Sequence, residues 1–74
     1  MRGRQTLGER IRRHRKSAGL TQEALARGAD IGRVTLVRLE KGGRTPRYKT
    51  LDALAGALGV PVSALLADPE ALLS

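Results

Sequence analysis

Apolar residues recur along the chain at helical spacing, and the sequence contains no alternating pattern typical of a strand. Leu7, Ile11, His14 and Ala18 fall at i, i+4, i+7 and i+11, which places them along one stripe of a helix. Similar spacing between capping residues predicts further helices. We expect five of them, over residues 7–18, 22–27, 33–41, 48–58 and 62–66, and one last turn over 70–73.

Threonines and glycines stand at the expected helix ends. Thr6 and Thr21 precede the first and second helices, where a hydroxyl can accept a hydrogen bond from a free backbone N–H. Gly19, Gly42 and Gly59 follow the first, third and fourth helices, where a left-handed residue commonly ends a helix. The pattern therefore predicts an all-α, compact five-helix fold with short connections.

The length and composition limit the classes of function. A chain of 74 residues makes at most one domain, and it has no Cys and a single His. These counts argue against a disulfide framework and a metal site, and no nucleophile set or phosphate loop suggests a catalytic site or a cofactor. No run approaches the roughly 18 apolar residues that cross a membrane. We expect a cytoplasmic protein without an enzymatic activity or a small-molecule pocket.

Charge is distributed unevenly along the sequence. Residues 1–49 carry all 14 basic and four acidic residues, whereas residues 50–74 carry three acidic residues and no basic one. Residues 1–5 read as a flexible basic arm. A basic front and an acidic, apolar back favour one face for a polyanion and another for a different contact. A generic solubilising surface is the alternative, but it would mix both signs along the whole chain.

The segment GLTQEALARGADIGRVTLVRLEKG, residues 19–42, resembles the helix-turn-helix of the Cro and phage-repressor type, the Xre-like family. The patterns L-G-E-R-I-R-x-x-R and T-L-D-A-L-A-G-A-L-G-V also match, so the resemblance covers about residues 6–66. It implies a DNA-binding domain over residues 6–67, with residues 68–74 as a short turn or tail. It also implies a transcriptional regulator, a repressor, that places its third helix in the major groove of double-stranded DNA.

The outward face of the third helix is the expected reading surface. Val34, Val37, Arg38 and Lys41 recur at helical spacing, opposite the inward leucines. Valines can contact thymine methyl groups, and arginines can bind guanine. The candidates for base contact are Arg33, Val34, Thr35, Val37 and Arg38. There are two alternatives. The valines pack on a neighbouring helix, or Arg33 binds only a phosphate.

Polar and basic residues around this helix are the expected phosphate contacts. They are Gln22, Lys41, Arg44, Arg47 and Lys49. The resemblance implies the role of Gln22, which begins the second helix near free N–H groups that suit an anion. The basic residues flank the loop after the third helix. Such contacts position a protein on DNA and carry little sequence information.

Glu40 lies on the inward edge of the third helix, where a carboxylate needs a partner. The resemblance pairs it with Arg15 of the first helix as a partly buried, structural ion pair. Three residues depart from the family pattern. Asp30 stands where a turn glycine is usual, Gly32 is a weaker cap than Ser or Thr, and His14 occupies a core stripe position, where we expect a buried neutral side chain.

Apolar residues in the acidic back end predict a homodimer contact. They are Val62, Leu65, Leu66, Leu72 and Leu73. A dimer would read a near-palindromic operator through two half-sites. The alternative for the leucines at 72 and 73 is that they fold back on their own domain. The alternative function is a protein-binding module, such as an antitoxin that binds a toxin, or a partner of an anti-repressor. A controller protein of a restriction-modification system would be one kind of transcriptional regulator, and so falls under the main hypothesis.

Overall fold

The computed structural model describes residues 6–42 and 45–66, and every regular element in these ranges is a helix. The helices are α1 (Leu7–Ser17), α2 (Gln22–Gly28), α3 (Arg33–Glu40), α4 (Tyr48–Leu58) and α5 (Val62–Leu66). The predicted all-α fold is confirmed, with ends that differ from the predicted bounds by at most one residue. The expectations for the arm at 1–5, for Arg44 and for the tail from residue 67, which includes Leu72 and Leu73, lie outside the described residues.

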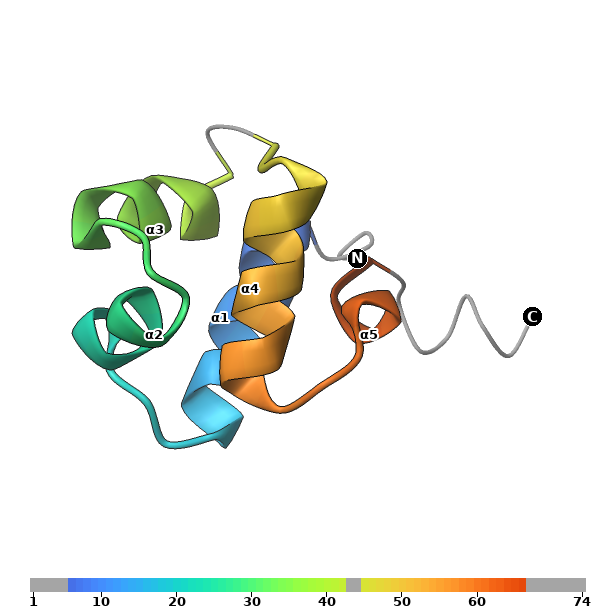
Figure 1. The fold of residues 1–74 in the computed structure, drawn as a ribbon, viewed down its shortest axis with the longest axis horizontal. Helices are drawn as coiled ribbons and strands as arrows, with labels where there is room; N and C mark the ends of the chain where they lie inside the picture. The colour runs from blue at the N-terminus through green and yellow to red at the C-terminus, as the bar shows by residue number, and fades with distance from the viewer. Residues whose placement is uncertain (1–5, 43–44, 67–74) are drawn as a thin grey trace, which may run out of the picture.

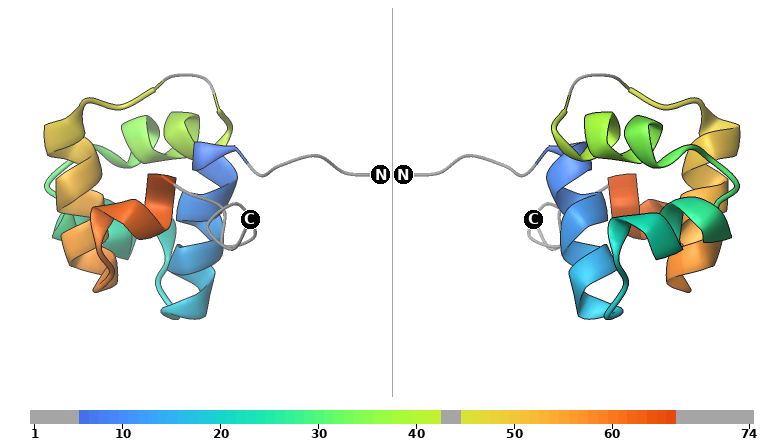
Figure 2. Two further views of the ribbon diagram at one scale, coloured as in Figure 1. Left: turned by 90° about the vertical axis from the view of Figure 1, so that its right-hand side faces the viewer. Right: turned by 90° about the vertical axis from the view of Figure 1, so that its left-hand side faces the viewer.

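A small aliphatic core joins all of these helices. Ile11, Leu25, Leu36, Leu54 and Leu65 are fully buried, and one comes from each helix in turn. In Figure 1, α2 and α3 lie together on one side of α1 and α4, and α5 lies on the other. Figure 2 shows the same arrangement from both sides. The core therefore ties the α2–α3 pair to the rest of the domain while the far side of α3 stays open.

Threonine caps start the first two helices, as predicted. The backbone N–H of Ala24 donates to the Thr21 hydroxyl at 3.0 Å. At α1 the cap is reciprocal, because the Glu9 N–H donates to Thr6 Oγ1 at 3.1 Å and the Thr6 N–H donates to Glu9 Oε1 at 2.8 Å. This capping box satisfies two backbone donors at once and fixes the start of α1. Gly32, the cap of α3, makes no side-chain bond to the helix.

Asp30, which stands where the family usually has a turn glycine, occupies the left-handed conformation. Its φ is +58°, and among the described non-glycine residues only Asp30 has a positive φ. The chain turns there as it does after α4, with the Ile31 N–H donating to the Ala26 carbonyl at 2.9 Å. Asp tolerates this backbone region better than most residues because its short polar side chain interacts locally. The α2–α3 turn therefore forms without glycine.

The buried face of α1 differs from the predicted stripe. Its buried residues are Gly8, Arg10, Ile11 and Arg15, whereas His14 is only half-buried and Ala18 is exposed. The expectation of a buried His14 and an inward Ala18 is wrong. The reason is that Gly8 and Arg15 face α3 for specific contacts, so the buried face turns away from a purely apolar stripe. Ala18 also lies beyond the helix, as its C-cap.

Residues 6–42 and 45–66 lack two features that would indicate other classes of site. No helix there combines the length and the apolar character that crossing a bilayer requires. The same residues contain no group of three or more His, Cys, Asp or Glu side chains that could hold a metal ion.

Candidate nucleic-acid interface

The outward face of α3 presents a row of exposed side chains. Arg33, Val34, Thr35 and Arg38 are all exposed, and Val34 keeps 62% of its surface accessible. A large apolar side chain so exposed on a short helix is available for contact with another molecule. Val37 is different, because it is half-buried beside α1 and α2. The expectation that both valines face outward therefore holds only for Val34.

The C-terminal end of α3 packs on the backbone of α1. A Cβ atom on Gly8 would collide with the Leu39 carbonyl oxygen and would lie 2.7 Å from the Glu40 carbonyl oxygen. Only a glycine allows the two helices to come this close. Sequence reasoning missed this contact. The available signal was a glycine inside a helical pattern, where it costs stability without a packing reason.

Arg15 and Glu40 form the ion pair that the resemblance implied. Arg15 Nε lies 2.7 Å from Glu40 Oε2, Arg15 Nη2 lies 3.1 Å from Glu40 Oε1, and both side chains are buried. Arg15 Nη1 also donates to the Leu20 carbonyl at 2.9 Å. The pair is bidentate, a geometry that adds directional strength to the charge attraction. It joins α1, the turn after α1, and the last residue of α3.

Gln22 is bound to this ion pair. Its side-chain Nε2 donates to Glu40 Oε1 at 3.1 Å, so both Glu40 oxygens are satisfied. The sequence analysis expected Gln22 to contact a phosphate and did not foresee this bond. The phosphate role stays a prediction. The bond places the first residue of α2 beside the last residue of α3.

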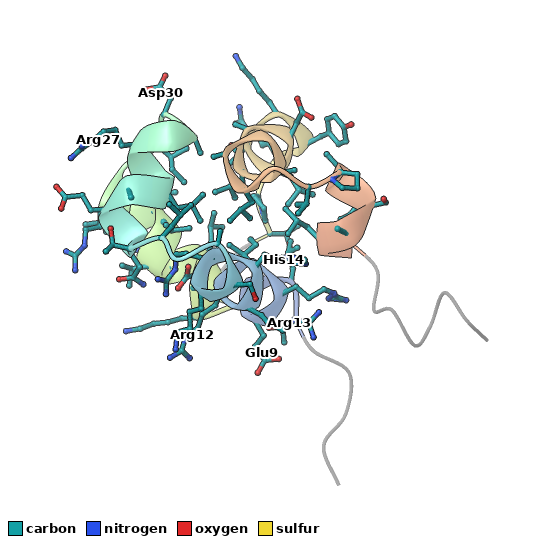
Figure 3. All side chains as sticks on the ribbon, turned by 90° about the horizontal axis from the view of Figure 1, so that it is seen from below. Glu9, Arg12, Arg13, His14, Arg27 and Asp30 are labelled. Atoms are coloured by element: carbon teal, nitrogen blue, oxygen red, sulfur yellow. The ribbon has the colours of Figure 1, made fainter. Side chains whose placement is uncertain are left out.

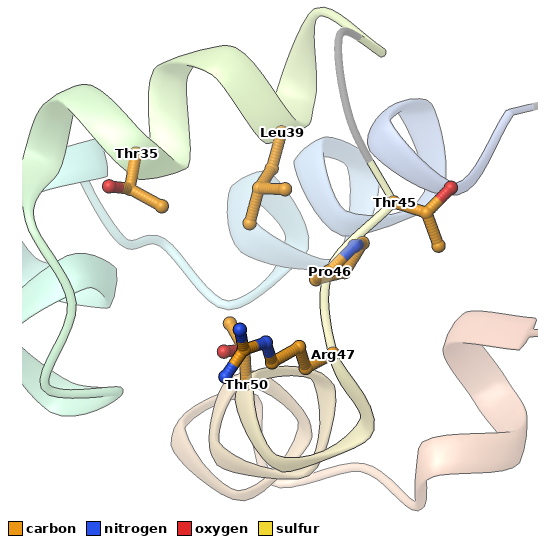
Figure 4. Close-up of a pocket in the computed structure, with 6 residues that line it drawn as sticks. All are labelled: Thr35, Leu39, Thr45, Pro46, Arg47 and Thr50. Atoms are coloured by element: carbon orange, nitrogen blue, oxygen red, sulfur yellow. The ribbon is translucent and has the colours of Figure 1, made fainter.

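Hollows adjoin α3 within the described part of the chain. One has a volume of about 550 Å³ and lies between α3 and the start of α4 (Figure 4), lined by Thr35, Leu39, Thr45, Pro46, Arg47 and Thr50. The second has about 430 Å³ and is lined by Thr21, Gln22, Glu23 and Arg33. The third has about 370 Å³ and is lined by Arg12, Arg15, Gln22, Val37, Glu40 and Lys41. Hollows thus border α3 both on its α4 side and on its α1–α2 side.

The described candidates for phosphate contact surround α3. Lys41 is the exposed C-cap of α3 and lines the third hollow. Arg47 is the exposed N-cap of α4 and lines the hollow shown in Figure 4. Lys49 is exposed in the first turn of α4, and Gln22 lies at the start of α2. The structure therefore gathers polar and basic groups at the borders of the exposed face.

The candidate dimer residues differ in accessibility. Leu66 is 54% exposed, but Leu65 is fully buried and Val62 packs partly against the core. The expectation that Leu65 contacts a second copy is wrong, because this side chain fills the core of its own chain. Sequence reasoning also missed Tyr48, which is 68% exposed at the start of α4. The signal available in the sequence was that Tyr48 is its only Phe, Tyr or Trp residue.

Comparison with known proteins identifies the family. The helix-turn-helix family model matches residues 11–65. The chain is 43% identical over 63 residues to the immunity repressor protein of Bacillus phage phi105, covering 85% of this chain and 44% of that protein. It is 38% identical over 61 residues to the cryptic phage CTXphi transcriptional repressor RstR of Vibrio cholerae, covering 82% and 55%. The chain belongs to the Xre-like, phage-repressor type of helix-turn-helix family, and it spans about half the length of these two relatives.

Solved structures show the same fold. The DNA-binding domain of the P22 c2 repressor superimposes with a TM-score of 0.83 at 32% identity, covering 88% of this chain and 86% of that domain. The biofilm master regulator SinR, solved in complex with DNA, gives a TM-score of 0.81 at 28% identity, covering 84% and 100%. SinR in complex with the SinI protein gives a TM-score of 0.82 at 27% identity, covering 93% of this chain and 68% of that chain.

Proposed function

We propose that this chain is a sequence-specific repressor of transcription that binds double-stranded DNA through α3. The observation that carries this proposal is the exposure of Arg33, Val34 and Arg38 on a helix whose other side is fixed in the core. The names of its relatives support it, since two are repressors and SinR was solved on DNA. An exposed helix of this kind fits the major groove, where base edges can be distinguished.

The residues of α3 take different roles in this proposal. Arg33, at the first helical position, and Arg38, in the last turn, can bind guanine O6 and N7. Val34 supplies an apolar surface for a thymine methyl group, and the Thr35 hydroxyl can bond either a base or a phosphate. Val37 is half-buried and contributes less contact area than Val34.

Phosphate contacts hold α3 in the groove. A helix in the major groove has a sugar–phosphate backbone along each side, and hollows border α3 on two sides. Arg47 and Lys49 serve the strand near α4, and Lys41 and Gln22 serve the strand near α1 and α2. To donate its side-chain amide to a phosphate, Gln22 would have to release Glu40.

A homodimer would place two reading helices on a near-palindromic site. Helix-turn-helix dimers read half-sites about 34 Å apart, one turn of DNA. Leu66 and Tyr48 are exposed apolar side chains that could contribute to such a contact. Because SinR also exists in complex with SinI, these exposed side chains could instead contact a partner protein, which is the second candidate role.

Titration of labelled duplex DNA at salt concentrations between about 50 and 200 mM tests the proposal. The basic candidates Lys41, Arg47 and Lys49 each neutralise one phosphate, so the affinity should fall with log salt at a slope steeper than about −2.5. A flat response would contradict the phosphate contacts. Sedimentation of the chain and of Leu66→Asp tests the dimer, since this substitution changes an exposed side chain and should favour the monomer.

A further inference from the structure

Arg12 belongs to the face of α1 that packs beside α3. Gly8, Arg12 and Arg15 are spaced at i, i+4 and i+7, which places them on one side of the helix. Gly8 touches the end of α3, and Arg15 binds its last residue. Arg12 lies between these two contacts and lines the same hollow as Lys41. In Figure 3, Arg12 lies on the side of α1 nearer α2 and α3, whereas Arg13 lies on the side nearer α5.

The charge around this hollow is positive. Arg12 and Lys41 are exposed at its border, while Arg15 and Glu40 neutralise each other in the buried ion pair. Within residues 6–42 and 45–66, no group forms a hydrogen bond or an ion pair with the Arg12 guanidinium. The hollow therefore offers two unneutralised cations around a volume of about 370 Å³, while the Gln22 amide on its lining is bound to Glu40.

We propose that this hollow binds a phosphate group of the DNA backbone, with Arg12 and Lys41 as its charged ligands. The inference rests on the proposed function and extends it, because it adds a contact from α1 to those from α2, α3 and α4. A guanidinium binds a phosphate through two parallel N–H groups, a geometry that an ammonium does not offer. Arg12 thereby fixes the strand on the α1–α2 side of α3, opposite the hollow that Arg47 lines.

The buried ion pair is a condition for this site. An unpaired Glu40 carboxylate beside the hollow would repel a phosphate. Arg15 and Gln22 together donate hydrogen bonds to both Glu40 oxygens, so its charge is compensated. Arg15 is therefore a positioning residue for the phosphate site, whereas Arg12 and Lys41 contact the phosphate.

The sharpest test compares Arg12→Ala with Arg13→Ala in the full chain. The two arginines are neighbours in sequence, both are exposed, and both lack a bonded partner in the described part of the chain. Loss of one phosphate contact should reduce the salt slope of DNA binding by about 0.9 unit and weaken binding on the order of tenfold. We expect this for Arg12→Ala, to an equal degree on every duplex, and no change of slope for Arg13→Ala.

A duplex with single neutral methylphosphonate linkages locates the phosphate. One neutral linkage should weaken binding of the unsubstituted chain clearly more than binding of Arg12→Ala, in which only Lys41 still contacts that phosphate. Thermal unfolding of both variants verifies the fold, and Arg12→Gln, which keeps a polar side chain, should reproduce the loss. Equal salt slopes in the two alanine variants, or equal sensitivity of Arg12→Ala and the unsubstituted chain to every neutral linkage, would overturn this site. If the unsubstituted chain itself fails to bind DNA, the proposed function is wrong.

Discussion

The two ends of α3 are built differently. At the C-terminal end, the Leu39 and Glu40 carbonyls pack against Gly8, and Arg15 pairs with the Glu40 side chain. At the N-terminal end, the cap makes no side-chain bond to the helix, the first three residues are exposed, and the preceding turn contains a left-handed Asp30. One end is fixed to α1, and the other is free for contact with a ligand.

This difference separates stability from recognition. Substitutions at the fixed end should change the free energy of unfolding, because they disturb buried contacts. Substitutions at the free end should change the binding of DNA, because the side chains there contact little of their own chain. A variant that changes both quantities equally would show that the two ends are not separate.

The largest effect is expected for Arg15→Ala. It leaves the buried Glu40 carboxylate without its cation, which should cost about 3–5 kcal/mol of the free energy of unfolding. Denaturant unfolding followed by circular dichroism measures this loss. The double variant Arg15→Met with Glu40→Leu removes both charges and should regain most of the stability. A double variant as unstable as the single one would show that packing, not the unpaired charge, sets the cost.

Gly8→Ala should have the next largest effect. The added methyl group meets backbone atoms of Leu39 and Glu40, which cannot rotate away, so the helices must separate at a cost of about 1–3 kcal/mol. Gly56→Ala is the matched control, since a Cβ atom there meets nothing within 4 Å in α4. The control should raise stability by roughly 0.5–1 kcal/mol. If both substitutions raise the free energy of unfolding, or both lower it, the close contact between Gly8 and α3 is contradicted.

Asp30→Gly should change the stability less than Gly8→Ala, and in the opposite direction. Glycine adopts the observed φ of +58° without strain, so the free energy of unfolding should rise by less than about 1 kcal/mol. Asp30→Ala should lower it, because alanine has neither the freedom of glycine nor the local polar contacts of aspartate. Thermal unfolding of the three proteins in one buffer ranks their stability. We expect Asp30→Gly to be the most stable, the unsubstituted chain to come next, and Asp30→Ala to be the least stable. Any other order would show that the turn is held by its surroundings.

The smallest effect on stability is expected for Val34→Ala. The side chain is 62% exposed, so the free energy of unfolding should change by at most about 0.5 kcal/mol. Its effect should appear in DNA preference instead. Replacing thymine by uracil at one position of a bound site should weaken the unsubstituted chain and leave Val34→Ala unaffected. If replacing thymine by uracil weakens neither protein at any position, Val34 does not contact a thymine methyl group.

Local patterns predicted most of the fold. Helical spacing and the threonine and glycine caps located all the described helices, because these signals depend on neighbouring residues. Tertiary contacts were harder to predict. Leu65 reads as surplus apolar surface until α5 is packed on the core, and Gly8 reads as a weak helix former until α3 lies against it. The resemblance supplied the Arg15–Glu40 pair, which no local pattern would have given.

The candidate site was predicted in type but not in every residue. Exposure of Arg33, Val34 and Arg38 agrees with a reading face deduced from spacing. Val37 lies on the same helical face but is half-buried beside α1 and α2, which a single-helix pattern cannot describe. Arg12 was not singled out among 14 basic residues, because only the packing of α1 against α3 distinguishes it from Arg13.

Selection of bound sites from random duplex DNA tests the central proposal, that the exposed face of α3 reads DNA sequence. It should be carried out in parallel with the unsubstituted chain and with Arg38→Ala. We expect the unsubstituted chain to enrich a near-palindromic site, and Arg38→Ala to lose preference at one base pair of each half-site, with a cost of about 1–3 kcal/mol. Enrichment of no sequence by the unsubstituted chain, or of the same sequence with the same preferences by both proteins, would contradict it.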